Sequence, residues 1–151
     1  MKINLFSNLT FRALIYLALR KDQYIRAKVI AEAYGVSYHH LKKVMISLME
    51  HGYVESAQGR NGGYKLAVSS DKINIGEVYR TTIENVALTE CFASPDKACV
   101  ILEECRLRSI LMGGVAQFIK ELDRFYLSDL TEHNELGLKE RLAIPIVNLQ
   151  D

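Results

Sequence analysis

Residues 27–51, AKVIAEAYGVSYHHLKKVMISLMEH, decide the fold of this 151-residue chain. Apolar residues at helical spacing predict a first helix over residues 27–34. The residues expected to face the core from this helix are Val29, Ile30 and Ala33. Gly35 ends the helix, because glycine readily adopts the left-handed conformation that a helix stop needs. Ser37 is a candidate N-cap for a second helix running to about His51, so the whole stretch predicts a helix-turn-helix.

The second helix combines an apolar stripe with a polar, partly basic face. Its expected core residues are Leu41, Val44, Met45, Leu48 and Met49. Exposed polar residues in the first turns of such a helix are typical of the recognition helix that enters the DNA major groove. The candidate DNA contacts are Ser37, Tyr38, His39, His40, Lys42 and Lys43. By position, the two histidines and Lys42 approach base edges, whereas phosphate contacts fall to Tyr38 and Lys43.

A β-hairpin is predicted directly after this helix. Residues 53–58 and 64–68 alternate as strands do, and GRNGG at 59–63 supplies a tight connection. A hairpin after a recognition helix is a wing, and its basic tip is suited to the minor groove, whose negative potential attracts arginine. The candidate wing contacts are Arg60, Asn61 and Gly62. Because GRNGG lacks the Gly-Lys followed by Ser or Thr of a P-loop, we do not expect nucleotide binding there.

Two further helices complete the first half of the chain. Residues 5–19 have an apolar face at helical spacing, with Ser7 or Asn8 as a plausible N-cap. The expected inward residues of this helix are Leu9, Ala13, Tyr16 and Leu17. Residues 73–80, INIGEVYR, predict a short helix or its lead-in. Its expected inward residues are Ile75 and either Val78 or Tyr79.

The net charge of +1 conceals an asymmetry between the two halves of the chain. Residues 1–80 carry twelve Lys or Arg against six Asp or Glu, a net charge of +6. Residues 81–151 carry seven against twelve, a net charge of −5. A basic front half favours a polyanionic partner such as DNA, although two solvated surfaces of opposite charge would give the same totals.

All three cysteines lie within residues 91–105, CFASPDKACVILEEC, at the spacing C-x7-C-x5-C. Ser94, Pro95 and Asp96 between them indicate a turn-rich loop. Three thiols on one short loop favour ligands for a metal or cluster over a disulfide framework, which needs an even number. The residues alone leave three alternatives open: buried thiols, a structural zinc site completed by His or Asp, and a sulfenic acid or disulfide switch.

Residues 106–127 carry the longest apolar pattern of the chain. The apolar face is too broad for a solitary surface helix, so we expect it to pack on the first domain and on a second copy of itself. The glycine pair at 113–114 lowers helix propensity by about 1 kcal/mol per residue and suggests close backbone packing or a bend. Ser128 is expected to cap a short helix through about His133, and residues 134–151 are assigned no structure.

Several functional classes are not expected from the pattern. The sequence has no run of about 18 apolar residues, and its first residues lack the apolar region and cleavage site of a signal peptide. We therefore expect a cytoplasmic protein with reduced cysteines and no membrane span. No enzyme is expected, because no motif links a histidine to the cysteines, and adjacent Glu103 and Glu104 point to different helix faces.

Five segments together resemble the NsrR and IscR type of bacterial winged-helix regulators. The matching segments are FRALIYLALR (11–20), YGVSYHHLKKVMISL (34–48), GRNGGYKL (59–66), INIGEV (73–78) and the cysteines ending in CRL (105–107). They span roughly residues 1–133 in the order of that family. The resemblance implies a homodimer that binds double-stranded DNA and carries an iron–sulfur cluster on the cysteine loop.

The resemblance favours the nitric-oxide-sensing branch, because Arg108 stands where the IscR type has a histidine. The implied cluster ligands are Cys91, Cys99 and Cys105. The branch also implies a 4Fe–4S rather than a 2Fe–2S cluster, with a fourth ligand donated by the first helix of the partner subunit. That position matches Asn8, whose neutral amide is a poorer iron ligand than a carboxylate. Its alternatives are another group, such as Glu90, Asp96 or water, and an open site.

Two other positions matter for the resemblance. Arg12 matches the family and either offsets thiolate charge near the cluster or is an ordinary surface or capping arginine. Gln58 replaces the arginine that many relatives have just before the first wing glycine. Arg60, two positions further on, is expected to take over the minor-groove contact.

The sequence thus predicts a mainly α fold with a small β-hairpin wing: a winged helix-turn-helix domain plus a long dimerisation helix. The expected divisions are a DNA-binding domain at 1–80, the cysteine loop at 81–105, the dimerisation and following short helix at 106–133, and a tail at 134–151. The predicted function is a repressor that binds a near-palindromic operator and loses DNA affinity when nitric oxide reacts with the cluster. The alternatives are a redox- or iron–sulfur-status-sensing regulator and a zinc-stabilised winged-helix module that contacts other proteins.

Overall fold

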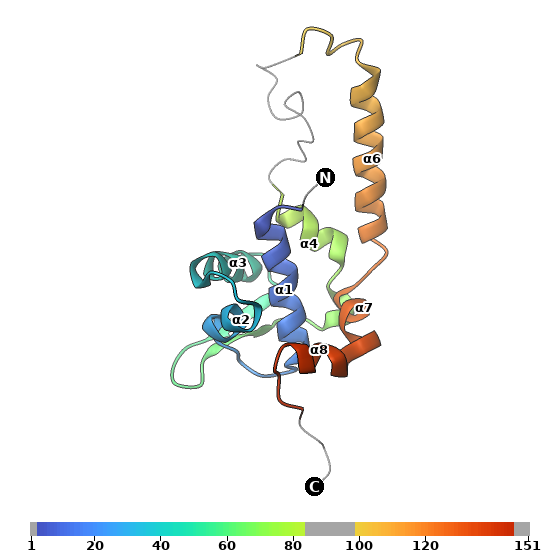
Figure 1. Ribbon diagram of the computed structural model, residues 1–151. Coiled ribbons are helices and arrows are strands. Elements are labelled where there is room, and N and C mark those ends of the chain that lie inside the picture. The colour runs from blue at the N-terminus through green and yellow to red at the C-terminus, as the bar shows by residue number, and fades with distance from the viewer. Residues whose placement is uncertain (1–2, 84–98, 147–151) are drawn as a thin grey trace.

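The computed structural model describes residues 3–83 and 99–146 and confirms a mainly helical fold with one β-hairpin (Figure 1). The elements in chain order are α1 (Leu5–Leu19), α2 (Ala27–Tyr34), α3 (Tyr38–Glu50), β1 (Val54–Ala57), β2 (Gly63–Leu66), the 3₁₀ turn η1 (Ser70–Lys72), α4 (Ile75–Thr81), α6 (Arg106–Leu122), α7 (Leu127–Thr131), the 3₁₀ turn η3 (Glu132–Asn134) and α8 (Glu135–Arg141). In Figure 1, α1 to α4 and the hairpin form one body, α6 extends away from it, and α7 and α8 return to α1. None of the described helices is both long enough and apolar enough to cross a membrane.

α1 is the central helix of this body, with nine of its fifteen residues buried. Its N-cap is Asn4, whose side-chain oxygen accepts a hydrogen bond from the Ser7 N–H at 2.7 Å. The expected cap at Ser7 or Asn8 is therefore wrong. The reason is that Ser7 already lies inside the helix, where its buried hydroxyl pairs with the hydroxyl of Thr82 at 2.6 Å.

The helix-turn-helix forms with nearly the predicted bounds. α2 ends at Gly35, whose φ of 60° is the left-handed conformation expected of a helix stop. The apolar stripe of α3 is confirmed, because the side chains of Leu41, Val44, Met45 and Leu48 are all buried. The inward set of α2 is partly wrong. Its buried residues are Ala27, Ile30 and Ala31, whereas Val29 is exposed because it lies on the far side of the helix from that row.

The wing is a two-stranded antiparallel hairpin in which Val54 pairs with Leu66 and Ala57 with Gly63. Ile25, just before α2, adds a β-bridge to Tyr64, with hydrogen bonds of 2.8 Å in both directions between their backbones. This bridge explains the last glycine of GRNGG. A Cβ on Gly63 would lie 2.6 Å from the backbone of Ile25, so only glycine allows the two chains to approach.

The long helix ends earlier than predicted, at Leu122 instead of residue 127. The reason is a long-range bridge between Asn74 and Tyr126. In it, the Ile75 N–H donates to the Phe125 carbonyl and the Leu127 N–H donates to the Ile73 carbonyl, each at 2.9 Å. These backbone bonds draw residues 125–127 out of the helix and place the side chain of Leu127 in the core.

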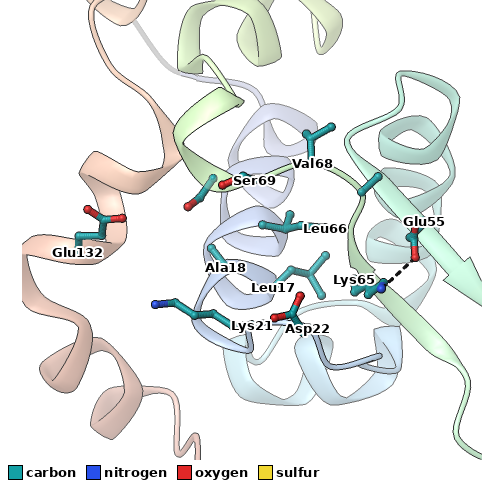
Figure 2. A pocket seen from close by; sticks show the side chains of 12 residues that line it. Leu17, Ala18, Lys21, Asp22, Glu55, Lys65, Leu66, Val68, Ser69 and Glu132 are labelled. Carbon is teal, nitrogen blue, oxygen red and sulfur yellow. Dashed lines mark ion pairs between the residues drawn. The ribbon is translucent and has the colours of Figure 1, made fainter.

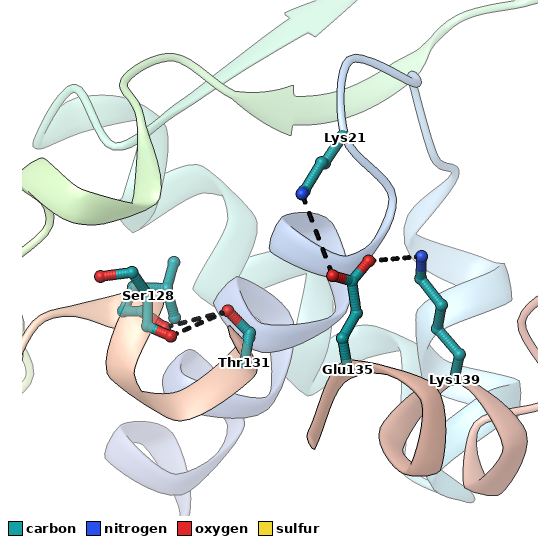
Figure 3. Close-up of polar contacts among 6 residues, drawn as sticks. Lys21, Ser128, Thr131, Glu135 and Lys139 are labelled. Atoms are coloured by element: carbon teal, nitrogen blue, oxygen red, sulfur yellow. Dashed lines mark hydrogen bonds and ion pairs between the residues drawn. The ribbon is translucent and has the colours of Figure 1, made fainter. Parts of the chain in front are cut away.

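α7 begins at Leu127, and the expected cap at Ser128 is wrong. The carboxylate of Asp129 instead accepts a hydrogen bond from the Tyr126 N–H at 2.7 Å. Figure 3 shows the hydroxyl of Thr131 directed at the carbonyls of the preceding turn, both at 3.3 Å. α7 thereby closes into one compact turn against α1.

Residues 135–146 are attached to the body, although the sequence assigned them no structure. Glu135, at the start of α8, forms ion pairs with Lys21 of the α1–α2 connection and with Lys139 one turn further along α8 (Figure 3). Beyond α8, the side chain of Ile144 is only 4% exposed and belongs to the main core. Leu138 and Leu142 also pack against this core, so α8 is held by several apolar contacts and one charged cluster.

Candidate nucleic-acid interface and cysteine segment

The recognition face of α3 is formed by the exposed side chains that lie outside its buried apolar stripe. All six predicted contacts on this helix are exposed: Ser37, Tyr38, His39, His40, Lys42 and Lys43. Tyr38 and His39 pack edge to face, with ring centroids 5.8 Å apart. The four ionisable side chains that follow the aromatic Tyr38 give this end of α3 an accessible polar surface of the kind that reads DNA.

The wing tip places Arg60 and Asn61 in solvent, whereas Gly62 is buried. A Cβ on Gly62 would overlap the carbonyl oxygen of Ala57, so this position shapes the turn. Arg26, just before α2, donates a hydrogen bond from Nη2 to the Arg60 carbonyl at 2.6 Å. The sequence reasoning missed Arg26. No signal in the sequence marks this contact, because the acceptor is a backbone carbonyl and the neighbouring bridge between Ile25 and Tyr64 is seen only in the structure.

The outer side of the hairpin carries a small polar network. Tyr24 donates a hydrogen bond to Glu55 at 2.7 Å, and Lys65 lies 3.2 Å from the same carboxylate and above the Tyr24 ring. The hydrogen bond from Tyr24, supported by Lys65, lowers the pKa of Glu55 below its ordinary value. The network joins Tyr24, in the connection between α1 and α2, to both strands of the hairpin and so holds the wing against this connection.

Beside this network, an open hollow of about 510 Å³ separates the hairpin from α1 and η3 (Figure 2). Its charged lining residues are Lys21, Asp22, Glu55, Lys65 and Glu132. Figure 2 shows Glu55 and Lys65 paired with each other across the hairpin. Because the lining mixes both signs of charge, the hollow does not favour one class of ligand.

The cysteine segment is described from residue 99 onward. Cys99 is exposed, and Cys105 is half-buried at the N-cap of α6. Turns join them, beginning with the hydrogen bond from the Leu102 N–H to the Cys99 carbonyl at 2.9 Å. Cys91, with Glu90 and Asp96, lies outside the described residues. Thiolate sulfur is the usual ligand of iron–sulfur clusters, so the chemistry of the two described donors fits such a group.

Within residues 3–83 and 99–146, no three His, Cys, Asp or Glu side chains are grouped closely enough to hold a metal ion. The predicted fourth ligand, Asn8, lies on the exposed side of the second turn of α1. Its neighbours Asn4 and Ser7 both bond to Thr82, at the end of α4, with distances of 3.4 and 2.6 Å. These bonds fix the first turn of α1 against the end of α4.

Arg12 lies one helical turn beyond Asn8. Its guanidinium is above the ring of Tyr34 in α2, 5.5 Å from the centroid, in a cation–π contact. Burial raises the pKa of Tyr34 to about 12, although the charge of Arg12 opposes part of that rise. The structure therefore gives Arg12 a packing contact between α1 and α2.

An aromatic contact joins the C-terminal half of α6 to the body. Tyr79 of α4 packs edge to face on Phe118, with ring centroids 5.5 Å apart. No residue of α6 is buried, and Leu107 and Ile110 are each 60% exposed. Within residues 3–83 and 99–146, a Cβ added at Gly113 or Gly114 would meet no atom of another element within 4 Å, so these residues do not supply the close packing expected at the glycine pair.

A clasp formed by Asn74, Arg80 and Asp123 joins α4 to the end of α6. Arg80 donates two hydrogen bonds to the Asp123 carboxylate, at 2.7 and 2.6 Å, and Asn74 donates to its backbone carbonyl at 2.8 Å. The hydrogen bonds from Arg80 lower the pKa of Asp123. Gly76 makes room for this arrangement, because a Cβ there would overlap the same carboxylate.

Comparisons with known proteins agree with this architecture. The sequence profile of the Rrf2 family, described as an iron-dependent transcriptional regulator, matches residues 3–133. The "HTH-type transcriptional regulator NsrR" of Halalkalibacterium halodurans is 37% identical over 138 residues, covering 90% of this chain and 94% of that protein. The protein of the same name from Geobacillus kaustophilus is 40% identical over 133 residues, covering 87% and 90%. Among solved structures, CymR, the global cysteine regulator of B. subtilis, superposes with a TM-score of 0.69 at 24% identity, covering 88% of this chain and 98% of that one.

Proposed function

Because this chain belongs to the Rrf2 family of iron-dependent transcriptional regulators, we propose that it is a cytoplasmic DNA-binding repressor that senses nitric oxide through an iron–sulfur cluster. One observation carries the proposal. The exposed polar face of α3 lies beside a wing with a basic tip, and the same chain places two thiols at the start of a helix clasped to that body. The DNA-contacting face and the cysteine site are thus connected through α6 and its contact with α4.

In this proposal α3 enters the major groove and the wing tip enters the minor groove. His39, His40 and Lys42 meet base edges, and Tyr38 and Lys43 meet phosphates. Arg60 contacts the minor groove with its side chain, while its carbonyl is held by Arg26. Ser37, Asn61 and Gly62 complete the contact surface that the sequence indicated.

The proposed active species is a homodimer formed through α6. This helix leaves Leu107, Ile110 and Met112 exposed, and the space around its glycine pair is open. An apolar face with small residues allows the backbone of a second helix to approach closely. Two-fold symmetry then pairs two recognition helices and requires a near-palindromic operator, with half-sites one or more helical turns apart.

Cys91, Cys99 and Cys105 are the proposed protein ligands, with a 4Fe–4S cluster favoured over 2Fe–2S. The cluster supplies iron that reacts with nitric oxide. Asn8 of the partner subunit is the candidate fourth ligand, and its neutral amide would bind iron less strongly than a carboxylate would. The exposure of Asn8 on α1 is compatible with donation to a second chain.

The chain's own residues connect ligand loss to DNA binding. Cys105 is the N-cap residue of α6, and Asp123, the residue after its end, accepts two hydrogen bonds from Arg80 of α4. When the cysteines are released, the start of α6 loses its anchor while its end remains clasped to the body. A change in the angle of this helix then becomes a change in the spacing of the two recognition helices, and affinity for DNA falls.

The decisive experiment is spectroscopy on anaerobically purified protein with iron and sulfide counts, followed by titration with nitric oxide and DNA-binding assays. We expect a coloured protein whose visible absorption and DNA affinity decline together. Cys99→Ala should lose both the absorption and the response to nitric oxide. A variant that binds DNA and responds like the wild type would exclude the proposed ligand set.

The same measurements separate the other candidates. A colourless protein with one zinc per chain would indicate a zinc-stabilised module instead of a sensor. A cluster that is insensitive to nitric oxide, but whose loss changes DNA affinity, would indicate a regulator that senses redox or iron–sulfur status.

A further inference from the structure

A second hollow, of about 590 Å³, opens on the proposed DNA-binding side of the body. It lies between the start of α2, the start of α3 and the second strand of the wing. Its lining residues are Arg26, Ala27, Lys28, Tyr38, Gly62, Gly63 and Tyr64. The surface is predominantly apolar, and among the described residues its charged lining consists of the two cations Arg26 and Lys28, with no acidic side chain.

The position of this hollow limits what can occupy it when DNA is bound. A recognition helix in the major groove and a wing in the adjacent minor groove lie on either side of one DNA strand. That strand must therefore cross the gap between the first turn of α3 and β2, where Tyr38 and Tyr64 form the walls of the hollow. The occupant that reaches this gap is a sugar–phosphate backbone.

We propose that the hollow binds one deoxyribose of this strand, and that Arg26 and Lys28 contact the phosphates on either side of the sugar. The inference rests on the proposed DNA-binding function and adds a contact site to it. A sugar ring suits a lining of alanine, glycine and tyrosine, and its flanking phosphates suit cations at the rim. The hollow is also continuous with the contact surface already described, since Tyr38 belongs to both.

The two cations are prepared for this role in different ways. The Arg26 guanidinium donates one hydrogen bond to the Arg60 carbonyl, and this bond fixes the position of the guanidinium. Its other N–H groups remain available for a phosphate. Lys28 lies 3.8 Å from Glu32 on the exposed face of α2, with both side chains largely in solvent. Because an exposed pair of this kind contributes little, Lys28 can exchange Glu32 for a phosphate.

The test uses a fluorescently labelled duplex of random sequence, about 30 base pairs long, titrated by anisotropy between about 50 and 200 mM salt. Such a probe needs no knowledge of the operator, because phosphate contacts are independent of sequence. We compare the wild type with Lys28→Gln, Arg26→Gln and the charge-matched control Lys72→Gln, an exposed lysine in η1. Circular dichroism and thermal melting establish that each variant is folded.

Losing one phosphate contact should reduce the slope of log K against log salt by about 0.9, or about 1.8 for a dimer. Lys28→Gln and Arg26→Gln should each show this reduction, and Lys72→Gln should keep the wild-type slope. Tyr38→Ala should lower affinity severalfold at every salt concentration without altering the slope, because the ring carries no charge. Lys28→Gln does not touch the wing, so its result is independent of any loosening caused by Arg26→Gln.

The proposal is overturned if Lys28→Gln keeps the wild-type slope while Lys43→Gln, the phosphate contact proposed on the recognition helix, reduces it. That outcome would be compatible with the proposed DNA-binding function and would reject only the proposed contact between the hollow and the DNA strand. If Tyr38→Ala binds the duplex with unchanged affinity, the proposal that the hollow binds a deoxyribose is likewise overturned. Failure of the wild-type protein to bind any duplex would instead reject the proposed DNA-binding function itself.

Discussion

The DNA-binding body and α6 differ in how far one chain completes them. In the body, α1 buries nine of fifteen residues, and α3 seals its stripe of large apolar side chains. α6 has seventeen residues, none of them buried, and its first two turns expose the side chains of Leu107, Ile110 and Met112. The body is therefore stable through its own core, whereas α6 has an apolar surface that only further contacts would remove from water.

The largest expected effect comes from truncating a leucine in each region. Leu41 is fully buried in α3, so Leu41→Ala should lower the free energy of unfolding by about 2–5 kcal/mol at any protein concentration. The matched change Leu107→Ala, in α6, removes the same atoms from a side chain that is 60% exposed. Its direct effect should stay within about 0.5 kcal/mol in a dilute, monomeric sample.

Urea denaturation at several protein concentrations measures both effects. If α6 packs against a second copy, the Leu107→Ala loss should grow as the wild type becomes dimeric, because association adds to apparent stability by mass action. A Leu107→Ala loss as large as that of Leu41→Ala, and equally independent of concentration, would show that the two regions do not differ as described.

A smaller effect is expected at the glycine pair of α6. Replacing Gly114 by alanine should stabilise the isolated helix by about 1 kcal/mol, because alanine has the higher helix propensity and its methyl group would meet no atom of another element among the described residues. In a dimer the added methyl group would separate two closely packed backbones and weaken association. Sedimentation equilibrium should therefore show a larger dissociation constant, while circular dichroism shows equal or greater helix content. Unchanged association would place the partner's backbone away from this glycine.

The sequence predicted the body better than it predicted α6 and the following turn, for a physical reason. The bounds of α2, the stripe of α3 and the existence of the wing depend on local periodicity and on glycines at turns, which are visible in any window of residues. The end of α6 at Leu122 depends instead on a bridge to Asn74, almost fifty residues away, and local pattern continued the helix to residue 127. Val29 was misplaced because spacing in a short helix does not fix which of two adjacent apolar residues turns inward.

The candidate site likewise contains residues that local sequence pattern predicts and residues that it does not. The exposed contacts on α3 followed from what its core stripe left outside, and the structure places all of them on the surface. The contact between Arg26 and the wing was not predictable, because its acceptor is a backbone carbonyl and leaves no mark in residue type. Completion of the cysteine site by Asn8 stays a prediction, since it requires a residue from another chain to meet ligands that include Cys91, outside the described residues.

The clasp between the two regions gives the smallest effect and a pH dependence that identifies it. Arg80 lowers the pKa of Asp123 in the folded protein, so the clasp contributes its full stability above the ordinary aspartate pKa of about 3.9. That contribution is lost as the pH falls through the lower folded value and the carboxylate takes up a proton. Asp123→Asn should therefore be less stable than the wild type at neutral pH, and the two should converge below about pH 4.

Urea denaturation at a series of pH values measures this convergence, with Asp71→Asn, an exposed aspartate in η1, as the matched control. The control should keep the acid dependence of the wild type, whereas Asp123→Asn should have a flatter profile. In the proposed regulator, Asp123→Asn should also bind DNA with less dependence on the state of the cysteines, because α6 would no longer be gripped by α4. A variant that keeps both the acid dependence and the coupling would show that the backbone bridge between Asn74 and Tyr126 alone joins α6 to the body.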